Sequence, residues 1–430
     1  MNAPDKPPPP APPCELLIVG AGPAGMAAAL AAAPSGVRIT LLDDNPVLGG
    51  QIWRDGPGAH LTPQALRMRE ALARCANVHL LCGTRVVSLA GSSALLLEDT
   101  KQGWVQPYDK LILCTGAREL LLPFPGWTLP GVTGAGGLQA LVKAGLPVEG
   151  ERIVIAGSGP LLLVAADTAR RAGAKVVRIA EQAGLPAVAG FAAQLLRWPG
   201  KAAQALGLAS AHYRTGTRVV SAQGEGRVQS ARLLHAGRET EIACDRVACG
   251  FGLVPNTELG QLLGCTLAPA GGGAQALAVD TLQATSVAGI YAAGECTGVG
   301  GSERALAQGR IAGLAAIDDS AAAQRHHAER AHWQAFAGQL QRHFALAPSL
   351  KTLARPETLV CRCEDVTQAA LAGCGGWTEA KLHTRCGMGA CQGRVCGAAA
   401  NFLFGWTPPA PRPPLSPARI ATLASPHTPD

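Results

Sequence analysis

Short apolar runs and Ala-rich stretches alternate in the N-terminal part of the chain. Residues 15–33, ELLIVGAGPAGMAAALAAA, begin with an apolar run, turn at glycines and continue with helical periodicity, which predicts strand, tight turn and helix. A second apolar run, VRITLL, ends at Asp43 and predicts another strand. Together these elements have the length of a strand–helix–strand unit that binds a dinucleotide.

The same pattern returns at residues 152–181, RIVIAGSGPLLLVAADTARRAGAKVVRIAE. We therefore predict an α/β fold with an internal repeat of Rossmann-type dinucleotide-binding domains. Short alternating runs between and after the repeats predict β-rich crossovers and closing strands. Residues 317–355 have helical periodicity and predict a helical connection. Pro-rich residues at 1–14 and 409–430 predict a disordered leader and an extended tail.

Composition narrows the class of protein. With 430 residues, 48% of them hydrophobic, the chain can bury the cores of about two or three domains. The net charge of +7 is spread without a stripe of basic and aromatic residues, which argues against nucleic-acid binding. No apolar run reaches the roughly 18 to 20 residues of a membrane helix, and the N-terminus lacks the regions of a signal peptide. We expect a cytoplasmic protein without a transmembrane segment.

The first glycine-rich turn, GAGPAG, has the spacing of a dinucleotide site. Gly20 permits the tight turn, Gly22 lets the backbone approach a pyrophosphate, and Gly25 lets the helix pack on the strand. The N-terminus of the helix offers free N–H groups to the phosphates. Asp43, at the end of the next strand, is placed to accept hydrogen bonds from a ribose.

The second glycine-rich turn departs from this pattern. Gly157 and Gly159 match the first glycines, but Leu162 stands at the third position and predicts a displaced helix or a wider turn. Glu181, at the end of the following strand, would suit the free 2′-hydroxyl of NAD rather than the phosphate of NADP. NAD(H) binding, binding of another nucleotide such as ATP, and a retained fold element without a ligand all remain open.

Cysteines gather near the C-terminus. The chain has 14 cysteines and no export signal, which favours reduced thiols or metal ligands over disulfides. CRCEDV supplies Cys361 and Cys363, and CQGRVC supplies Cys391 and Cys396, close pairs that suit a 2Fe-2S cluster. Chemistry alone does not choose between Cys386 and Cys391 as a ligand. Structural zinc is the rival, although C-x-C spacing is unusual for zinc.

Three segments point to FAD as the first dinucleotide. PVLGGQIW at 46–53, LILCTGARELLLPFPG at 111–126 and GIYAAGECTGVGGSERALAQGRIAG at 289–313 resemble signatures of the two-dinucleotide-domain flavoproteins that include thioredoxin and glutathione reductases. The resemblance implies FAD contacts from Gly50, Gln51, Thr115, Gly116, Gly294 and Glu295. The redox cysteine pair of those reductases is missing, since Cys244 and Cys249 flank a strand pattern away from both turns. We therefore do not expect thiol–disulfide chemistry.

The cysteine-rich stretch resembles the BFD-like ferredoxin domain, named after bacterioferritin-associated ferredoxin. Its variants on flavoprotein subunits show C-R-C-E followed by R-x-G-M-G-x-C-Q-G-R-x-C, which implies ligation by Cys361, Cys363, Cys391 and Cys396. By the same resemblance Cys386 is a bystander. Gly387, Gly389 and Gly393 would let backbone N–H groups approach the sulfides.

Residues 15 to 415 as a whole resemble the flavoprotein subunits of heteromeric dehydrogenases, such as those of opine oxidase, of proline and D-hydroxyproline dehydrogenases, and of hydrogen cyanide synthase. The resemblance implies an electron-transfer chain with FAD and a 2Fe-2S cluster. Its implied partners are a D-amino-acid-oxidase-like catalytic subunit, together with a small ferredoxin-like subunit. The alternatives are a stand-alone NAD(P)H-dependent oxidoreductase and a non-enzymatic iron–sulfur sensor or scaffold. Arg118 and Arg304 are candidates for flavin or partner contacts.

We accordingly expect an FAD-binding domain from residues 15–125 and 245–316, and an NAD(P)-like Rossmann domain at 126–244. After the helical connection at 317–355, a small helical BFD-like 2Fe-2S domain occupies 356–408, followed by the tail at 409–430.

Overall fold

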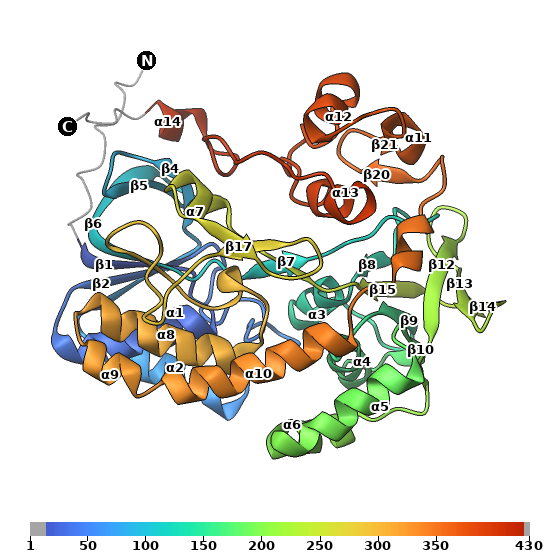
Figure 1. Cartoon of the computed structure of the whole chain (residues 1–430), viewed down its shortest axis with the longest axis horizontal. Helices are drawn as coiled ribbons and strands as arrows, with labels where there is room; N and C mark the ends of the chain where they lie inside the picture. The colour runs from blue at the N-terminus through green and yellow to red at the C-terminus, as the bar shows by residue number, and fades with distance from the viewer. Residues whose placement is uncertain (1–13, 425–430) are drawn as a thin grey trace.

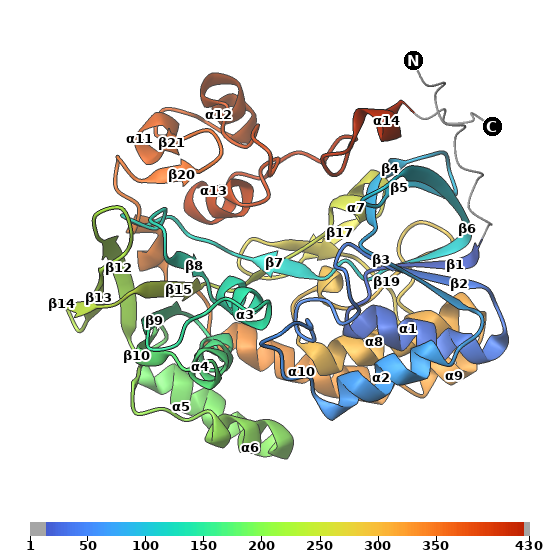
Figure 2. The same cartoon turned by 180° about the vertical axis from the view of Figure 1, so that it is seen from behind.

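The computed structural model describes residues 14–424. A seven-stranded sheet in the order β3-β2-β1-β6-β5-β4, with β19 paired to β6, forms its first layer (Figures 1 and 2). Its strands are β1 (Cys14–Val19), β2 (Ile39–Asp43), β3 (Val78–Cys82), β4 (Arg85–Leu89), β5 (Ala94–Glu98), β6 (Gly103–Leu113) and β19 (Ile290–Ala292). Because Cys14 already belongs to β1, the leader expected at 1–14 is one residue too long, and its other residues lie outside the described chain.

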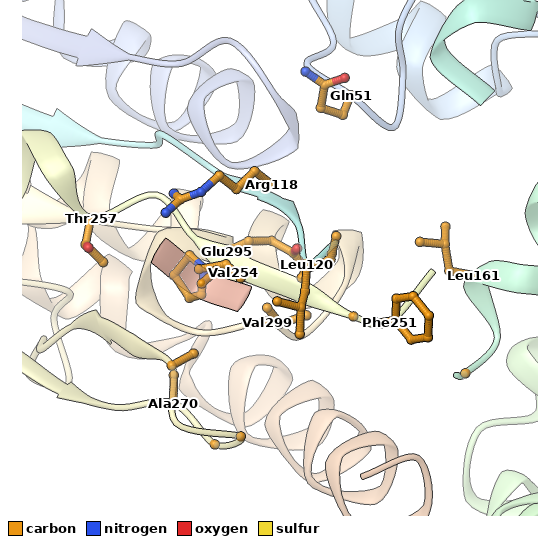
Figure 3. A pocket seen from close by; sticks show the side chains of 18 of the residues that line it. Gln51, Arg118, Leu120, Leu161, Phe251, Val254, Thr257, Ala270, Glu295 and Val299 are labelled. Atoms are coloured by element: carbon orange, nitrogen blue, oxygen red, sulfur yellow. The ribbon is translucent and has the colours of Figure 1, made fainter. Parts of the chain in front are cut away.

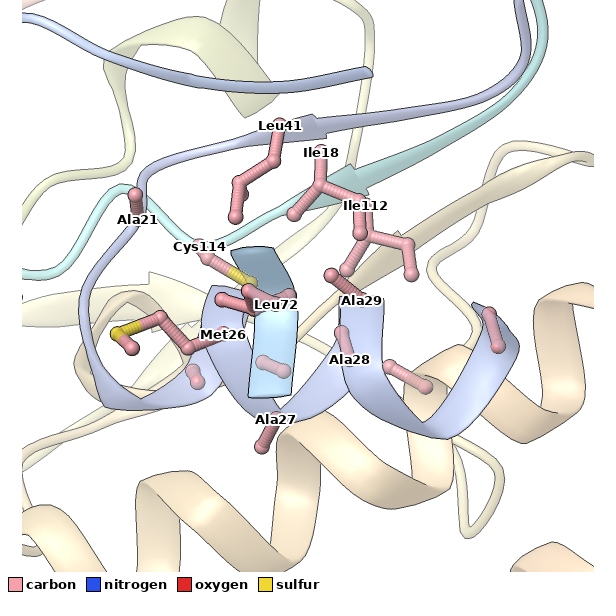
Figure 4. Packing of buried hydrophobic residues seen from close by; sticks show 14 of the residues in the cluster. Ile18, Ala21, Met26, Ala27, Ala28, Ala29, Leu41, Leu72, Ile112 and Cys114 are labelled. Atoms are coloured by element: carbon pink, nitrogen blue, oxygen red, sulfur yellow. The ribbon is translucent and has the colours of Figure 1, made fainter. Parts of the chain in front are cut away.

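The predicted strand–turn–helix at residues 15–33 is present as β1 and α1 (Pro23–Ala32). Helix α8 (Ser302–Ala316) packs along α1, and small side chains let the two backbones approach closely (Figure 4). A Cβ on Gly309 would lie 2.1 Å from the carbonyl oxygen of Ala24, and one on Gly313 would lie 2.3 Å from that of Ala28. Helix α2 (Pro63–Ala73) joins the same core.

A five-stranded sheet in the order β11-β10-β9-β15-β8 contains the second half of the repeat. Here β9, α4 and β10 correspond to β1, α1 and β2, so the predicted internal repeat is confirmed. The elements of this half are β8 (Val132–Gly134), α3 (Ala135–Lys143), β9 (Arg152–Gly157), α4 (Leu161–Arg171), β10 (Lys175–Glu181), α5 (Leu185–Gln194), α6 (Pro199–Gly207), β11 (Tyr213–Arg214), β12 (Thr217–Gln223), β13 (Ser230–His235), β14 (Arg238–Ala243) and β15 (Arg246–Gly250).

Two antiparallel strands carry the chain between the halves. β7 (Ala117–Glu119) leaves the first sheet and β16 (Leu253–Pro255) returns, with Arg118 opposite Val254. After β16 come α7 (Glu258–Leu262), β17 (Leu267–Pro269) and β18 (Gln275–Leu277).

The helical connection expected at residues 317–355 contains α9 (Ser320–Gln324) and α10 (His327–His343). Helix α10 runs from α8 in the first half to α5 in the second half (Figure 1). Phe336 and Phe344 meet Phe191 of α5 with ring centroids 6.0 Å and 5.0 Å apart. This aromatic contact ties the connection to the second half.

The C-terminal region forms a small, mostly helical unit above the crossover strands (Figures 1 and 2). It comprises β20 (Leu359–Cys361), β21 (Val366–Thr367), α11 (Gln368–Leu371), α12 (Trp377–Thr384) and α13 (Cys396–Phe404). Residues 407–424, here called the C-terminal strap, then cross to the first sheet and end in α14 (Ile420–Leu423). The rest of the expected tail, 425–430, lies outside the described residues. Within 14–424, no helix has the length and apolarity needed to cross a bilayer.

Candidate functional site

The first glycine-rich turn, residues 20–25, leaves no room for side chains at its first and last positions. Gly20 has a φ of +105°, and a Cβ there would lie 2.1 Å from the carbonyl oxygen of Cys114. A Cβ on Gly25 would lie 1.8 Å from the carbonyl oxygen of Gly20. The second contact brings the N-terminus of α1 against the end of β1, as the fingerprint requires, and the first brings the turn against the residue that follows β6.

Asp43 closes this turn from the end of β2. One carboxylate oxygen accepts a hydrogen bond from the N–H of Ala21 at 2.7 Å, and the other accepts one from the N–H of Asn45 at 2.8 Å. Gly50 lies beside the turn, because a Cβ there would be 3.0 Å from the Cα of Gly22. Gln51 is exposed and accepts a hydrogen bond from Arg54 at 2.8 Å. The predicted ribose contact of Asp43 stays a prediction.

The other predicted FAD residues reach the same end of the first sheet. The Thr115 hydroxyl, directly after β6, donates to the carbonyl oxygen of Asn256 at 2.6 Å, and Gly116 follows with a φ of +69°. Gly294 approaches α1, since a Cβ there would lie 2.9 Å from that of Ala24. Glu295 accepts hydrogen bonds from the backbone N–H groups of Gly300 at 3.2 Å and Gly301 at 2.8 Å.

Buried Gln308 and Arg304 of α8 hold this loop, and both belong to the segment 289–313 that resembles a flavoprotein signature. Gln308 accepts a hydrogen bond from the N–H of Gly294 at 3.0 Å. The Arg304 guanidinium donates to the carbonyl oxygens of Gly298 and Thr297. Arg304, expected at the flavin or at a partner, thus holds the loop between Glu295 and α8.

The second glycine-rich turn, residues 157–162, has room for a leucine because its helix begins later. Gly157 is as confined as Gly20, since a Cβ there would lie 1.9 Å from the carbonyl oxygen of Gly250. Helix α4 begins at the fifth residue of the motif, Leu161, whereas α1 begins at the fourth, Pro23. Leu162 is fully buried in the core beneath. Helix α4 thus starts one residue later in its motif than α1 does, and the displaced helix or wider turn expected from Leu162 stays a prediction.

Glu181 occupies in the second half the place of Asp43 in the first. Its carboxylate accepts hydrogen bonds from the N–H groups of Gly159 at 2.7 Å and Ala183 at 2.8 Å. The side chain is 0% exposed, and this burial raises the pKa of Glu181 to about 7. The predicted contact of this carboxylate with a ribose stays a prediction.

Residues 344–347, here called the covering segment, lie on the second turn. The Ser158 hydroxyl donates to the carbonyl oxygen of Phe344 at 2.9 Å. Gln182 donates to the carbonyl oxygen of Ala345 at 3.0 Å and accepts from the N–H of Ala347 at 3.1 Å. Polar groups that could meet a phosphate are thus partly used by the chain itself.

Five cysteines come together in the C-terminal unit, and we call them the cysteine group: Cys361, Cys363, Cys386, Cys391 and Cys396. The sulfur atoms of Cys361, Cys386 and Cys396 lie within 4.8 Å of one another, and all three residues are buried. Cys363 is exposed and Cys391 is half-buried. The Cys396 thiol, hydrogen-bonded to Cys391, lowers the pKa of Cys391 to about 4.

Sulfur-only donors at this spacing fit either an iron–sulfur cluster or a four-thiolate zinc ion. Cys386 belongs to this group, although the resemblance leaves it outside the ligand set. The residues alone leave the choice between Cys386 and Cys391 open, and the ligand set stays a prediction.

The glycines of this loop permit close packing. A Cβ on Gly387 would lie 2.5 Å from the ring of Trp377, and one on Gly393 would lie 3.0 Å from it. A Cβ on Gly389 would lie 2.3 Å from that of Cys363. The loop therefore folds down on Trp377 and on the Cys361–Cys363 turn, a reason for glycine that the sequence alone did not reveal.

Arg118 connects this loop to the first half of the molecule. Its Nε donates to the carbonyl oxygen of Arg394 at 3.0 Å, between Cys391 and Cys396 in the chain. Its Nη1 donates to Asn256 at 2.8 Å and pairs with Glu258 at 2.8 Å. Since Asn256 also bonds Thr115, Arg118 joins the predicted flavin segment to the predicted ligand loop.

A cavity of about 1600 Å³ lies where the three regions meet. Figure 3 shows Gln51, Arg118 and Glu295 on its wall, with Leu161 and Phe251 from the second half. Gly387, Gly393 and the strap residues 407–417 line it from the C-terminal unit. The cavity therefore borders the first set of predicted site residues, the second turn and the cysteine loop.

Comparisons with known proteins agree with this arrangement. The A subunit of opine oxidase from Agrobacterium tumefaciens is 34% identical, with 96% of this chain and 92% of the relative covered. The HcnB subunit of hydrogen cyanide synthase from Pseudomonas protegens is 32% identical, with 88% of this chain and 89% of the relative covered. L-proline dehydrogenase of P. horikoshii has the same fold, with a TM-score of 0.64 at 17% identity over 96% of this chain and 79% of that one.

The family resemblance that the motifs suggested is thereby confirmed. Residues 14–329 match the pyridine nucleotide-disulphide oxidoreductase family, for which FAD and nucleotide binding are expected. This chain therefore belongs to the pyridine nucleotide-disulphide oxidoreductase family and is a flavin oxidoreductase.

Proposed function

We propose that this chain is the electron-transfer flavoprotein subunit of a heteromeric dehydrogenase for amines or amino acids of the opine, proline or D-hydroxyproline type. FAD would bind at the first turn, with Asp43 on the ribose and Thr115, Gly116, Gly294 and Glu295 along the rest of the cofactor. A 2Fe-2S cluster would be held by Cys361, Cys363, Cys391 and Cys396. The relatives named above are subunits of larger enzymes, which supports a partner chain that binds the substrate.

The observation that carries this proposal is the bond from Arg118 to the Arg394 carbonyl oxygen. It places the cysteine loop beside the segment that follows Thr115, around one cavity. A bound flavin can accept a hydride and release single electrons to an iron–sulfur centre. Arg118 would hold the two binding sites at a fixed separation.

The covering segment argues against the stand-alone NAD(P)H-dependent alternative. Ser158 and Gln182 already bond Phe344, Ala345 and Ala347, so a pyridine nucleotide would have to displace these contacts. We therefore expect electrons to enter from a D-amino-acid-oxidase-like partner rather than from NADH. ATP at the second turn would face the same obstacle.

Anaerobic purification followed by assays for flavin, iron, sulfide and zinc tests the proposal. We expect one FAD with about two irons and two sulfides per chain. The flavin should stay oxidised when NADH is added alone and should bleach when the catalytic partner and an opine or proline are present. Rapid bleaching by NADH alone would overturn the assignment in favour of a pyridine-nucleotide oxidoreductase. Zinc without iron would overturn the proposal that the cysteines hold a 2Fe-2S cluster.

A further inference from the structure

The cysteine group contains one thiol more than a four-ligand cluster uses. Cys386 is 0% exposed, and its sulfur lies within 4.8 Å of those of Cys361 and Cys396. These two cysteines come from the two different ligand pairs. Cys386 therefore lies between the pairs, inside the group.

The backbone around Cys386 directs it inward. Arg385 ends α12 in the left-handed region, with a φ of +63°, and so turns the chain toward the core. The Arg385 guanidinium donates to Glu364 at 2.7 Å, which ties this turn to the residue after Cys363. The N–H of Cys386 approaches the Thr384 hydroxyl at 3.2 Å. The Arg385–Glu364 pair thus ties the residue before Cys386 to the residue after Cys363, while the Thr384 contact holds the local turn.

The four cysteines of the proposed ligand set differ in exposure. Cys361 and Cys396 are buried, Cys363 is exposed and Cys391 is half-buried. Met388, between Cys386 and Cys391, is 40% exposed, so this side of the loop faces solvent. Oxidants would reach Cys363 and Cys391 first, while Cys386 stays covered.

We propose that Cys386 is a reserve ligand that replaces Cys391 at the metal. This inference rests on the proposed function for the identity of the metal. If the Cys391 thiolate left iron and took up a proton, the Cys386 thiol would give up its proton and bind iron in its place. In a Cys391→Ala chain the Cys386 thiolate would take the vacant position directly, and its proton would go to water. Four thiolates then hold the cluster as before, and no electron is gained or lost. Gly387 and Gly389, which have no side chains, let the segment between the two cysteines adjust.

The test compares the full-length Cys391→Ala chain with the Cys386→Ala/Cys391→Ala double variant. Alanine is chosen because a serine oxygen could itself ligate iron. The matched control is Cys374→Ala/Cys391→Ala, since Cys374 is a partly buried cysteine of the same unit outside the group. Iron, zinc, sulfide and FAD per chain are measured, together with visible and EPR spectra.

We expect Cys391→Ala and the Cys374 control to keep most of their metal, with a shifted EPR signal. The Cys386 double variant should lose metal by roughly tenfold or more while FAD stays bound. Equal loss of metal in Cys391→Ala and in the double variant would overturn the inference. FAD content and the thermal unfolding temperature show whether a variant has simply failed to fold.

The outcomes separate this inference from the function on which it rests. Zinc without sulfide in the unmodified chain would remove the electron-transfer cluster, and the pattern of zinc retention among the variants would still decide the role of Cys386. No metal in the unmodified chain would overturn both and leave Cys386 as a packing residue.

Discussion

Gly309 and Gly338 are both inside helices but have opposite surroundings. Around Gly309 of α8 the backbone of α1 fills the space that a Cβ would need, whereas a Cβ on Gly338 of α10 would meet no atom within 4 Å. We expect Gly309→Ala to destabilise the protein by about 1–3 kcal/mol through overpacking. Gly338→Ala should stabilise it by about 0.5–1 kcal/mol, because alanine is the better helix former.

Thermal or denaturant unfolding of the two variants side by side checks this pair, with FAD content as a second measurement. An unchanged Gly309→Ala protein would mean that α1 and α8 are not packed backbone to backbone.

Glu181 gives stability a pH dependence with a defined sign. Its pKa is about 7 in the folded protein against 4.5 for the free group, so the folded chain holds the proton more tightly than the unfolded chain. The free energy of unfolding should therefore be highest below the pKa of the free group, 4.5. It should fall by about 3 kcal/mol as the pH rises from there to the folded-state pKa of about 7.

The measurement is the unfolding temperature at about pH 5 and about pH 8 for the natural chain and for Glu181→Gln. Glutamine cannot titrate, so we expect the unfolding temperature to fall less between the two pH values in the variant than in the natural chain. Equal losses in both proteins would refute the assignment to Glu181.

At the residue scale, much of the first turn could be predicted from the sequence. The close approach of Gly25 to Gly20 follows from a local pattern in which strand, turn and helix are consecutive, whereas that of Gly20 to Cys114 joins segments far apart in the chain. The place of Cys386 could not be predicted in this way. Which sulfur atoms meet depends on how the loop folds over Trp377, and spacing along the chain does not determine that.

The C-terminal strap is attached to the first sheet through Glu98, and this attachment can be tested. Buried Glu98 of β5 accepts hydrogen bonds from the N–H of Arg419 at 2.9 Å and the Thr422 hydroxyl at 2.6 Å. In Glu98→Ala both donors lose their partner, and we expect the strap to be cleaved roughly tenfold faster by protease. Glu70→Ala is the control, because within residues 14–424 Glu70 forms an ion pair with Arg74 alone, on the exposed face of α2. Equal cleavage rates would mean that Glu98 does not anchor the strap.

The repeat of strand, helix and strand was predictable because each unit is local, with buried apolar strands on either side of a glycine-rich turn and a helix. The covering segment and the strap were not. Hydrophobic periodicity indicates which face of α10 is buried, but not that the residues after it bond Ser158 and Gln182. Likewise, a Pro-rich composition predicts an extended chain, but it does not indicate which strand that chain will contact.

Strand β7 connects three regions of the molecule through the side chains of Arg118 and Glu119. Arg118 reaches the cysteine loop, while Glu119 accepts hydrogen bonds from the N–H groups of Gly136 at 2.6 Å and Gly137 at 2.8 Å, at the start of α3. Neighbouring residues of one short strand thus hold the C-terminal unit and the second half against the first. The TGARE sequence carried the flavin resemblance, but nothing in it indicated these distant partners.

Arg118→Ala should separate the C-terminal unit from the first half without emptying either binding site. It removes the bonds to Arg394 and Asn256 and leaves Glu258 without its cation. We expect FAD and iron contents to be retained, while electrons pass from photoreduced flavin to the cluster at least about tenfold more slowly.

Rapid spectroscopy after anaerobic photoreduction measures that transfer. Arg152→Ala is the control, since Arg152 pairs with Asp245 where the interior strands β9 and β15 of the second sheet begin, outside the cysteine group. Identical transfer rates in the Arg118 and Arg152 variants would show that Arg118 does not set the separation.

The strap also bears on the order of events during biosynthesis. Residues 407–417 form one wall of the cavity and follow every other lining residue in the chain, so the ribosome makes that wall last. Until Arg419 reaches Glu98, the growing protein has an entrance on this side. We expect a cofactor as large as a dinucleotide to enter most readily in that interval, before residues 407–417 complete the wall of the cavity.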